Sequence, residues 1–196
     1  MRFGHLHTHS HYSLLQALPK IDELVKAAKE DNHEALALTD NGNMYGALEF
    51  YKECKKREIK PIIGVDAYIT PRDRHSKVAG VDKERYRLIL LAKDESGYKS
   101  LLKLVSISNL EGFYYKPRMD FEILEKYNKG LIAISSSWSG DISTALRSHD
   151  IEKAKNLIQK YKGIYGEDFY IELTMHGELL GHNEHMKVLA EFAKEN

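Results

Sequence analysis

The chain of 196 residues has little cysteine, no excess of charge and no long apolar run. Its one cysteine, Cys54, cannot form an internal disulfide and excludes a zinc site built from cysteines. Lys plus Arg and Asp plus Glu number 29 each, which argues against a chain that binds nucleic acid mainly through a net positive field. The longest apolar run, Leu88–Ala92, is too short to span a membrane, and Met1–His5 lacks the apolar core of a signal peptide. We therefore expect one cytoplasmic, non-membrane domain over residues 1–196.

Short apolar segments alternate with amphipathic segments along the chain. The alternation predicts parallel strands joined by helical crossovers, and both a doubly wound sheet and a barrel satisfy it. The polar segment 71–86 is expected to leave the core. The expected helices cover 21–30, 44–51, 154–161 and 183–196, and the expected strands follow the histidine-rich start at 35–39, 61–69, 87–92, 131–135 and 169–173.

Histidine is abundant, with ten residues, four of which stand at positions 5, 7, 9 and 11. On a β-strand, residues two apart point the same way, so His7 and His9 are expected to present two imidazoles to one pocket. Two imidazoles are half of a site for Zn²⁺ or Mn²⁺, with carboxylates completing the shell.

Two aspartates stand where such carboxylates are expected. Asp40 directly follows the strand expected at 35–39, and Asp66 lies within the apolar segment Ile62–Tyr68. Function in parallel α/β folds gathers at the carboxyl ends of strands. A buried aspartate needs a partner, which is either a basic side chain or a metal ion in the histidine pocket. Both interpretations of Asp66 stay open at this point.

Several ordered segments resemble the PHP (polymerase and histidinol phosphatase) domain family. The resemblance is to the version at the N-terminus of bacterial DNA polymerase III alpha subunits, and it runs from residue 3 to about 180 in order and spacing. The similar segments are His5–Leu15, Ala37–Tyr51, Lys60–Tyr68, Leu90–Tyr98, Glu111–Asp120 and Gly130–Ser135.

The resemblance implies an α/β fold, a distorted (β/α) barrel of the PHP type with a metal cleft at the strand ends. It implies that the chain is the front of a longer polymerase and stops before the last barrel strands. DNA synthesis and DNA contact then belong to the parent protein. His7, His9 and Asp66 stand at ligand positions of the family, which implies Zn²⁺, Mn²⁺ or Mg²⁺ as the metal.

Other ligand positions depart from the family pattern, because they carry Gln16, Asn41, Arg87 and Ser137. These groups bind metal poorly, and arginine cannot coordinate at all. A guanidinium in the cleft would replace the charge of the metal and form a fork with a carboxylate. We therefore expect a degenerate cleft in which Arg87 pairs with Asp66 or Asp40, and these three residues are the candidates for any catalytic role.

Three other residues are candidates for the cleft or for a nucleic-acid contact. His176 follows the strand expected at 169–173 and also resembles a family position. Lys116 and Arg118 lie beside Tyr114 and Tyr115, a mixture of charge and aromatic rings that suits bases and phosphates. His182 and His185 are expected at the surface, at a helix start.

Three functions remain in competition. The first is a structural and interaction module of a replicative polymerase, which contacts the other polymerase domains or a proofreading or clamp-associated subunit. The second is a metal-dependent phosphoesterase with 3′–5′ exonuclease activity. The third is a stand-alone phosphatase of the histidinol-phosphate kind, which the polymerase-type segment 111–120 disfavours.

Overall fold

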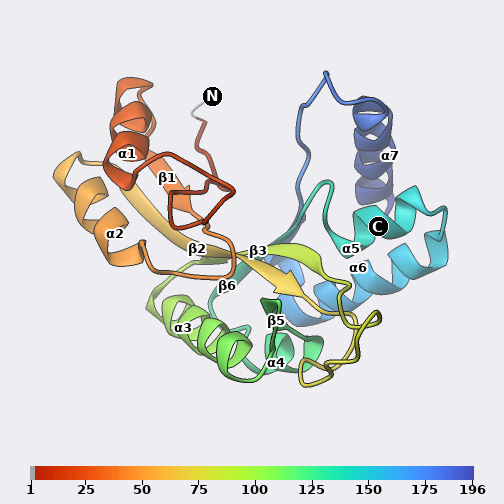
Figure 1. Cartoon of the computed structure of the whole chain (residues 1–196). Helices are drawn as coiled ribbons and strands as arrows, with labels where there is room; N and C mark the ends of the chain where they lie inside the picture. The colour runs from red at the N-terminus through yellow and green to blue at the C-terminus, as the bar shows by residue number, and fades with distance from the viewer. Residues whose placement is uncertain (1–2) are drawn as a thin grey trace.

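The computed structural model describes residues 3–196, which form seven α-helices and seven strands in a mixed α/β fold (Figure 1). A short 3₁₀ helix at Gly166–Asp168 precedes the last strand. The helices are α1 Ile21–Glu30, α2 Ala47–Lys56, α3 Glu95–Leu110, α4 Phe121–Lys126, α5 Asp141–Arg147, α6 Ile151–Tyr165 and α7 His182–Glu195. The strands are β1 Ala35–Leu38, β2 Lys60–Ile69, β3 Tyr86–Ala92, β4 Phe113–Tyr114, β5 Lys116–Met119, β6 Leu131–Ser135 and β7 Phe169–Ile171.

Strand β2 organises the sheet, whose order is β4-β5-β2-β3-β6-β7 with β1 also paired to β2. The first half of β2 pairs in parallel with β1, from Ala35 opposite Lys60 onward, and its second half pairs in parallel with β5. Asp66 lies between these two pairings, opposite Asn41 in an isolated bridge. Asp66 therefore lies in the stretch of β2 between the residues that pair with β1 and the residues that pair with β5.

The expectation of parallel strands is wrong for β3, which runs antiparallel to both β2 and β6. Two neighbouring parallel strands need a crossover connection, which is usually a helix. The segment between β2 and β3 contains no helix, and β3 therefore pairs with β2 in the antiparallel direction. Parallel pairing is found where a helix does intervene, across α2 and across α5 and α6.

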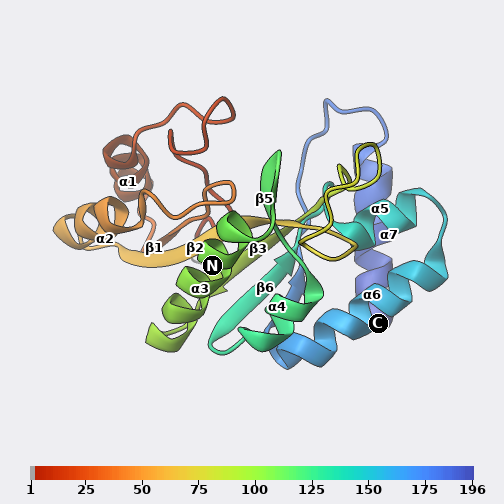
Figure 2. The same cartoon turned by 60° about the horizontal axis from the view of Figure 1, so that its bottom comes forward.

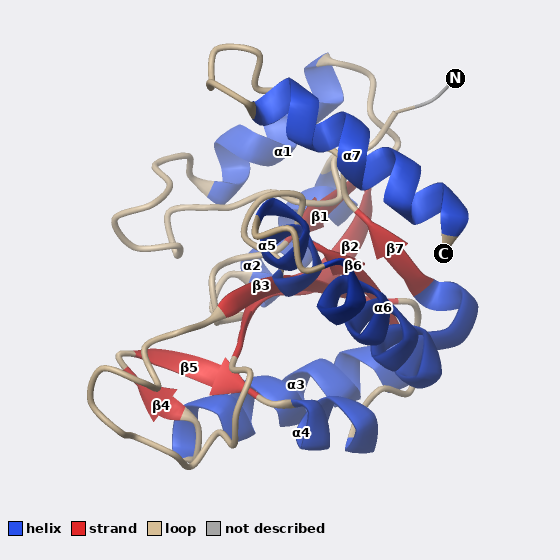
Figure 3. Cartoon of the chain, turned by 90° about the vertical axis from the view of Figure 1, so that its right-hand side faces the viewer, coloured by secondary structure: helices blue, strands red, loops and turns tan. Residues whose placement is uncertain are grey.

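Helices flank the sheet at both ends, with α1 and α2 beside β1 and with α5, α6 and α7 at the opposite end (Figures 1 and 3). Helices α1 and α2 pack on β1 through residues such as Ile21, Val25 and Phe50, and the spacing of α1 predicted its bounds correctly. Strand β3 is apolar on both faces, because Leu88 and Leu90 pack in the main core while Ile89 and Leu91 pack with Ala37 and Ile134 on the other face. Ile89, Leu91 and Ile134 of this second cluster line a cavity of 830 Å³.

Candidate functional site

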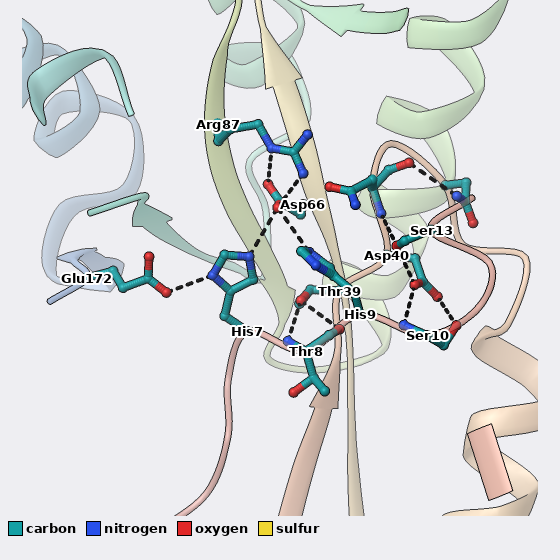
Figure 4. A network of polar contacts seen from close by, with 12 residues as sticks. His7, Thr8, His9, Ser10, Ser13, Thr39, Asp40, Asp66, Arg87 and Glu172 are labelled. Carbon is teal, nitrogen blue, oxygen red and sulfur yellow. Dashed lines mark hydrogen bonds and ion pairs between the residues drawn. The ribbon is translucent and has the colours of Figure 1, made fainter. Parts of the chain in front are cut away.

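The N-terminal segment carries its histidines into the sheet without forming a regular strand, which corrects the expected strand geometry. It runs along β1, where Ala37 N–H donates to His5 O at 2.9 Å and Thr39 N–H donates to Thr8 O at 2.8 Å. His7 and His9 still point to the same place, as Figure 4 shows.

That place is the carboxylate of Asp66. The Nε2 atoms of His7 and His9 each lie 3.1 Å from Asp66 Oδ2. Arg87, from β3, donates through Nε to Asp66 Oδ1 at 2.8 Å and through a second guanidinium nitrogen to Oδ2. The predicted pairing of Arg87 with Asp66 is therefore present, and both oxygens of this buried carboxylate are occupied.

Glu172 completes the cluster and was missed by the sequence analysis. Its Oε1 lies 2.7 Å from His7 Nδ1, while its Oε2 accepts from the Ser137 backbone N–H at 3.1 Å. Glu172 directly follows β7, so the rule that polar groups gather at strand ends could have found it. The expected strand was extended to residue 173, which hid this position inside the strand.

The cluster balances its own charge. Burial by itself would lower the pKa of His7, but hydrogen bonds to Asp66 and Glu172 outweigh burial and raise it from 6.5 to about 9. Burial likewise opposes ionisation of Asp66 and Glu172, yet hydrogen bonds from His7 hold both pKa values below their ordinary range, with His9 and Arg87 adding to the effect on Asp66. Two cations, His7 and Arg87, thus face two anions.

This cluster predicts a specific pH dependence of stability. Because the pKa of His7 is raised to about 9 on folding, its contribution is fully present below pH 6.5 and is lost as pH rises through 9. The shift corresponds to about 3 kcal/mol.

Urea unfolding between pH 6.5 and 9 is expected to show this decline in stability, and His7→Gln is expected to flatten it. An equally steep decline in His7→Gln would contradict the assignment. The series stops at pH 9, since Cys54, whose pKa burial raises to about 12, contributes above that.

Asp40 lies apart from this cluster. Its carboxylate accepts from Ser10 N–H and Oγ–H, both at 2.7 Å, and from Ser13 Oγ–H at 2.6 Å. It is buried and holds the loop that follows the histidines. A catalytic role for Asp40, or a pair with Arg87, does not fit this geometry, because its lone pairs already bind the loop.

Arg118 is fully buried, so the predicted nucleic-acid contact does not fit either. Its guanidinium donates to four backbone carbonyls at 2.8–3.1 Å, those of Gly112, Asp82, Arg74 and Ser76. Three of these carbonyls belong to the excursion between β2 and β3. The side chain thus ties that excursion to β5.

The remaining candidates fall into two cavities. His176 and Ser137 line a cavity of 450 Å³ together with His7 and His9. His182 lines it too, and both His182 and His185 are buried, which corrects their expected surface position. Gln16, Asn41 and Lys116 line a separate pocket of 260 Å³.

The histidine–aspartate group has the residue types of a metal centre. Ligand atoms of His7, His9 and Asp66 lie within 4.8 Å of one another. Metal ligation requires neutral imidazole and free carboxylate oxygens. Here His7 faces a carboxylate at each nitrogen and Arg87 occupies both oxygens of Asp66. In this arrangement the residues do not fit a metal ion.

The fold and the cluster define a mixed α/β domain with a polar cleft beside Asp66 of β2 and Glu172 after β7. The family model of the PHP domain matches residues 5–176, and the chain belongs to this family. It is 51% identical over 177 residues to DNA polymerase III subunit alpha of Borreliella burgdorferi, and 46% identical over 177 residues to that of Aquifex aeolicus. These matches cover 90% and 87% of this chain but 15% of each relative.

Solved structures confirm the predicted fold class. An amidohydrolase from Chromobacterium violaceum, with bound sulfate and no metal, matches 98% of this chain and 82% of its own, with a TM-score of 0.60 at 13% identity. A candidate metal-dependent phosphoesterase from Bifidobacterium adolescentis matches 98% of this chain and 83% of its own, with a TM-score of 0.61 at 11% identity.

The helices within residues 3–196 include none with the length and apolar character of a membrane span.

Proposed function

We propose that this chain is a single structural and interaction domain of a replicative DNA polymerase alpha subunit, with a cleft closed by internal ion pairs in place of metal ions. In this role it contacts the other domains of the polymerase chain, and a proofreading or clamp-associated subunit, in the bacterial cytoplasm. DNA synthesis then belongs to the rest of the alpha subunit.

The observation that carries the proposal is the two-pronged contact of Arg87 with Asp66. A guanidinium keeps its charge at every physiological pH and matches the geometry of a carboxylate. It therefore supplies the positive charge that a divalent ion would otherwise bring to Asp66. His7, held between Asp66 and Glu172, supplies a second positive charge.

Metal content tests this proposal. Tag-free protein is dialysed against trace Zn²⁺ and Mn²⁺ and measured by elemental analysis, beside the double variant Asn41→His, Arg87→His. We expect less than about 0.1 metal ion per wild-type chain, since each added ion must displace a guanidinium and a proton. The variant is expected to gain metal and a higher melting temperature on adding it.

The control is a triple variant in which His7→Ala is added, and it is expected to lose the recovered metal. Circular dichroism of each variant verifies the fold. Stoichiometric metal in the wild type that disappears on His7→Ala would overturn the proposal.

A second candidate function is metal-dependent phosphoester hydrolysis, with Zn²⁺, Mn²⁺ or Mg²⁺ as the ion. The grouping of His7, His9 and Asp66 favours it, as does the likeness to a candidate metal-dependent phosphoesterase. It requires Arg87 to leave Asp66. Metal in the wild type would select this candidate, and a nuclease assay on 3′-ended DNA would follow.

A further inference from the structure

A separate pocket of 260 Å³ lies where three distant segments meet. The hairpin of β4 and β5 stands against the loop that follows β1, so closely that a Cβ on Gly42 would lie 2.8 Å from the Pro117 ring. The loop of residues 12–16 closes a third side. Figure 2 shows β5 rising beside the loop that follows β1. We call this the aromatic pocket, and the side chains that matter here are Asn41, Tyr45, Tyr68, Phe113, Tyr115 and Lys116.

Aromatic rings stand in this pocket largely uncovered. Tyr45 is 72% exposed, Tyr115 is 62% exposed and Phe113 is 51% exposed. Large aromatic side chains gain free energy when they leave water, and rings gathered in one exposed place mark a binding surface. Three such rings in one pocket therefore indicate a ligand with flat apolar faces.

The backbone at Tyr115 supports a ligand-binding role for its ring. Tyr115 has φ of +61°, in the left-handed region that glycine and asparagine adopt more readily than a bulky residue. Tyr115 lies at the tip of the hairpin, between the paired residues Tyr114 and Lys116. Asparagine would adopt this backbone conformation with less strain than tyrosine. A strained and exposed tyrosine therefore indicates that its ring contacts a ligand.

Cations surround these rings. Lys83 Nζ lies 5.6 Å from the centre of the Tyr115 ring, and the charged groups of Arg85 and Lys116 each lie 5.8 Å from the centre of the Tyr68 ring. Within residues 3–196, none of these three forms an ion pair with a carboxylate at 4.0 Å or less.

The acids that neighbour Lys83 and Arg85 in the sequence are already engaged. Glu84 accepts a hydrogen bond from the Tyr86 hydroxyl. Asp82 is buried and accepts from Ser76 Oγ–H and Val78 N–H. The edge of the pocket therefore carries positive charge available to an anion.

One amide in the pocket has no partner. Both the Oδ1 and the Nδ2 of Asn41 are buried without a hydrogen bond, whereas the amide of Asn43 bonds the surrounding backbone. A carboxamide offers one acceptor and one donor side by side, which matches the edge of a nucleobase.

We propose that the aromatic pocket binds one unpaired nucleobase of a single strand, with neighbouring phosphates held by Lys83, Arg85 and Lys116. Rings for stacking, cations for phosphates and a free amide for the base edge are the combination that single-strand binding uses. An acidic protein segment would use the cations but leave the rings and the amide unmatched. The pocket adjoins the ion-paired cleft, since the Arg87 guanidinium lies 4.2 Å from the centre of the Tyr68 ring, but Tyr45, Phe113, Tyr115 and Lys116 take no part in that cleft, so the inference goes beyond the proposed function.

Fluorescence anisotropy of the 196-residue chain tests the proposal, with labelled 12-mers of deoxythymidylate and of uridylate, which compare DNA with RNA. Tyr115→Asn removes the ring and also relieves the backbone strain. We expect it to keep or raise the melting temperature and to weaken binding at least about fivefold. Lys83→Gln with Lys116→Gln is expected to reduce the slope of log K against log salt by about 1.4.

Tyr51 and Lys55 of α2 provide the matched control, because Lys55 Nζ also lies 5.6 Å from the centre of the exposed Tyr51 ring. Tyr51→Asn and Lys55→Gln are expected to leave affinity unchanged. The proposal would be overturned if the pocket variants and the α2 variants lost affinity equally. It would also be overturned if an abasic 12-mer bound as tightly as the 12-mer with bases. Stronger competition by a glutamate oligopeptide than by the 12-mer would replace it with a protein-binding site. None of the substitutions touches His7, His9, Asp66 or Arg87, so this result is independent of metal content.

Discussion

Arg87→Met is expected to lower the free energy of unfolding by about 3–5 kcal/mol, because it leaves Asp66 as a buried charge without its strongest partner. His7 and His9 still contact the carboxylate, which places the expected loss toward the lower end. Urea unfolding at pH 7 in the presence of a chelator measures it. Asp66→Asn in the Arg87→Met background removes the orphaned charge and is expected to recover part of the loss.

An exposed pair of similar length provides the comparison. Lys93 Nζ lies 2.7 Å from Asp168 Oδ2, and nearly half of the lysine side chain is exposed. Lys93→Met is expected to cost far less than Arg87→Met, because water screens an exposed ion pair. If Arg87→Met cost no more than Lys93→Met, the ion-paired cleft would not be the stabilising feature proposed here.

Arg118→Met is expected to destabilise the domain by about 4–6 kcal/mol, since it removes the guanidinium donor from the carbonyl oxygens of Arg74, Ser76 and Asp82, while Gly112 O keeps the Arg118 backbone N–H. Arg118→Lys is expected to recover little, because an ammonium cannot reproduce the planar fork that reaches four acceptors. Thermal and urea unfolding measure both variants.

Arg72→Met is the control for this second series. Arg72 lies in the same excursion and pairs with Asp82 at 3.4 Å, but half of its side chain is exposed. It is expected to cost less than Arg118→Met, because the Asp82 carboxylate keeps its hydrogen bonds from Ser76 and Val78. A comparable loss in Arg72→Met and Arg118→Met would show that burial of the guanidinium is not what matters.

Local sequence pattern was sufficient where one element decides its own structure. The spacing of Ile21, Val25 and Ala28 predicted α1 with its correct bounds, because an apolar stripe depends only on helical geometry. The apolar run of β3 predicted a buried strand, but gave no direction. The direction of β3 depends on the connection before it, which periodicity does not describe.

The sequence predicted the site residues whose chemistry is distinctive. It did not predict the surroundings of residues whose partners come from distant parts of the chain. Arg87 stands at a ligand position of the family that the chain resembles, and this predicted its pairing with Asp66 or Asp40, of which the structure has the pair with Asp66. Asp40 has the same chemistry as Asp66, yet two serines of a neighbouring loop bind its carboxylate, and no pattern within the strand shows this. Arg118 resembled a surface cation because its four carbonyl partners come from residues up to 44 positions away.

The carbonyls that Arg118 holds also decide how the excursion between β2 and β3 opens. Arg74, Ser76 and Asp82 share one donor group, so their segment is released together when that group leaves. Amide hydrogen exchange across residues 74–82 should then report a single cooperative opening, and protease cleavage there should follow it. Lys83 and Arg85 come directly after this unit, so any charged ligand that they bind would suppress that opening.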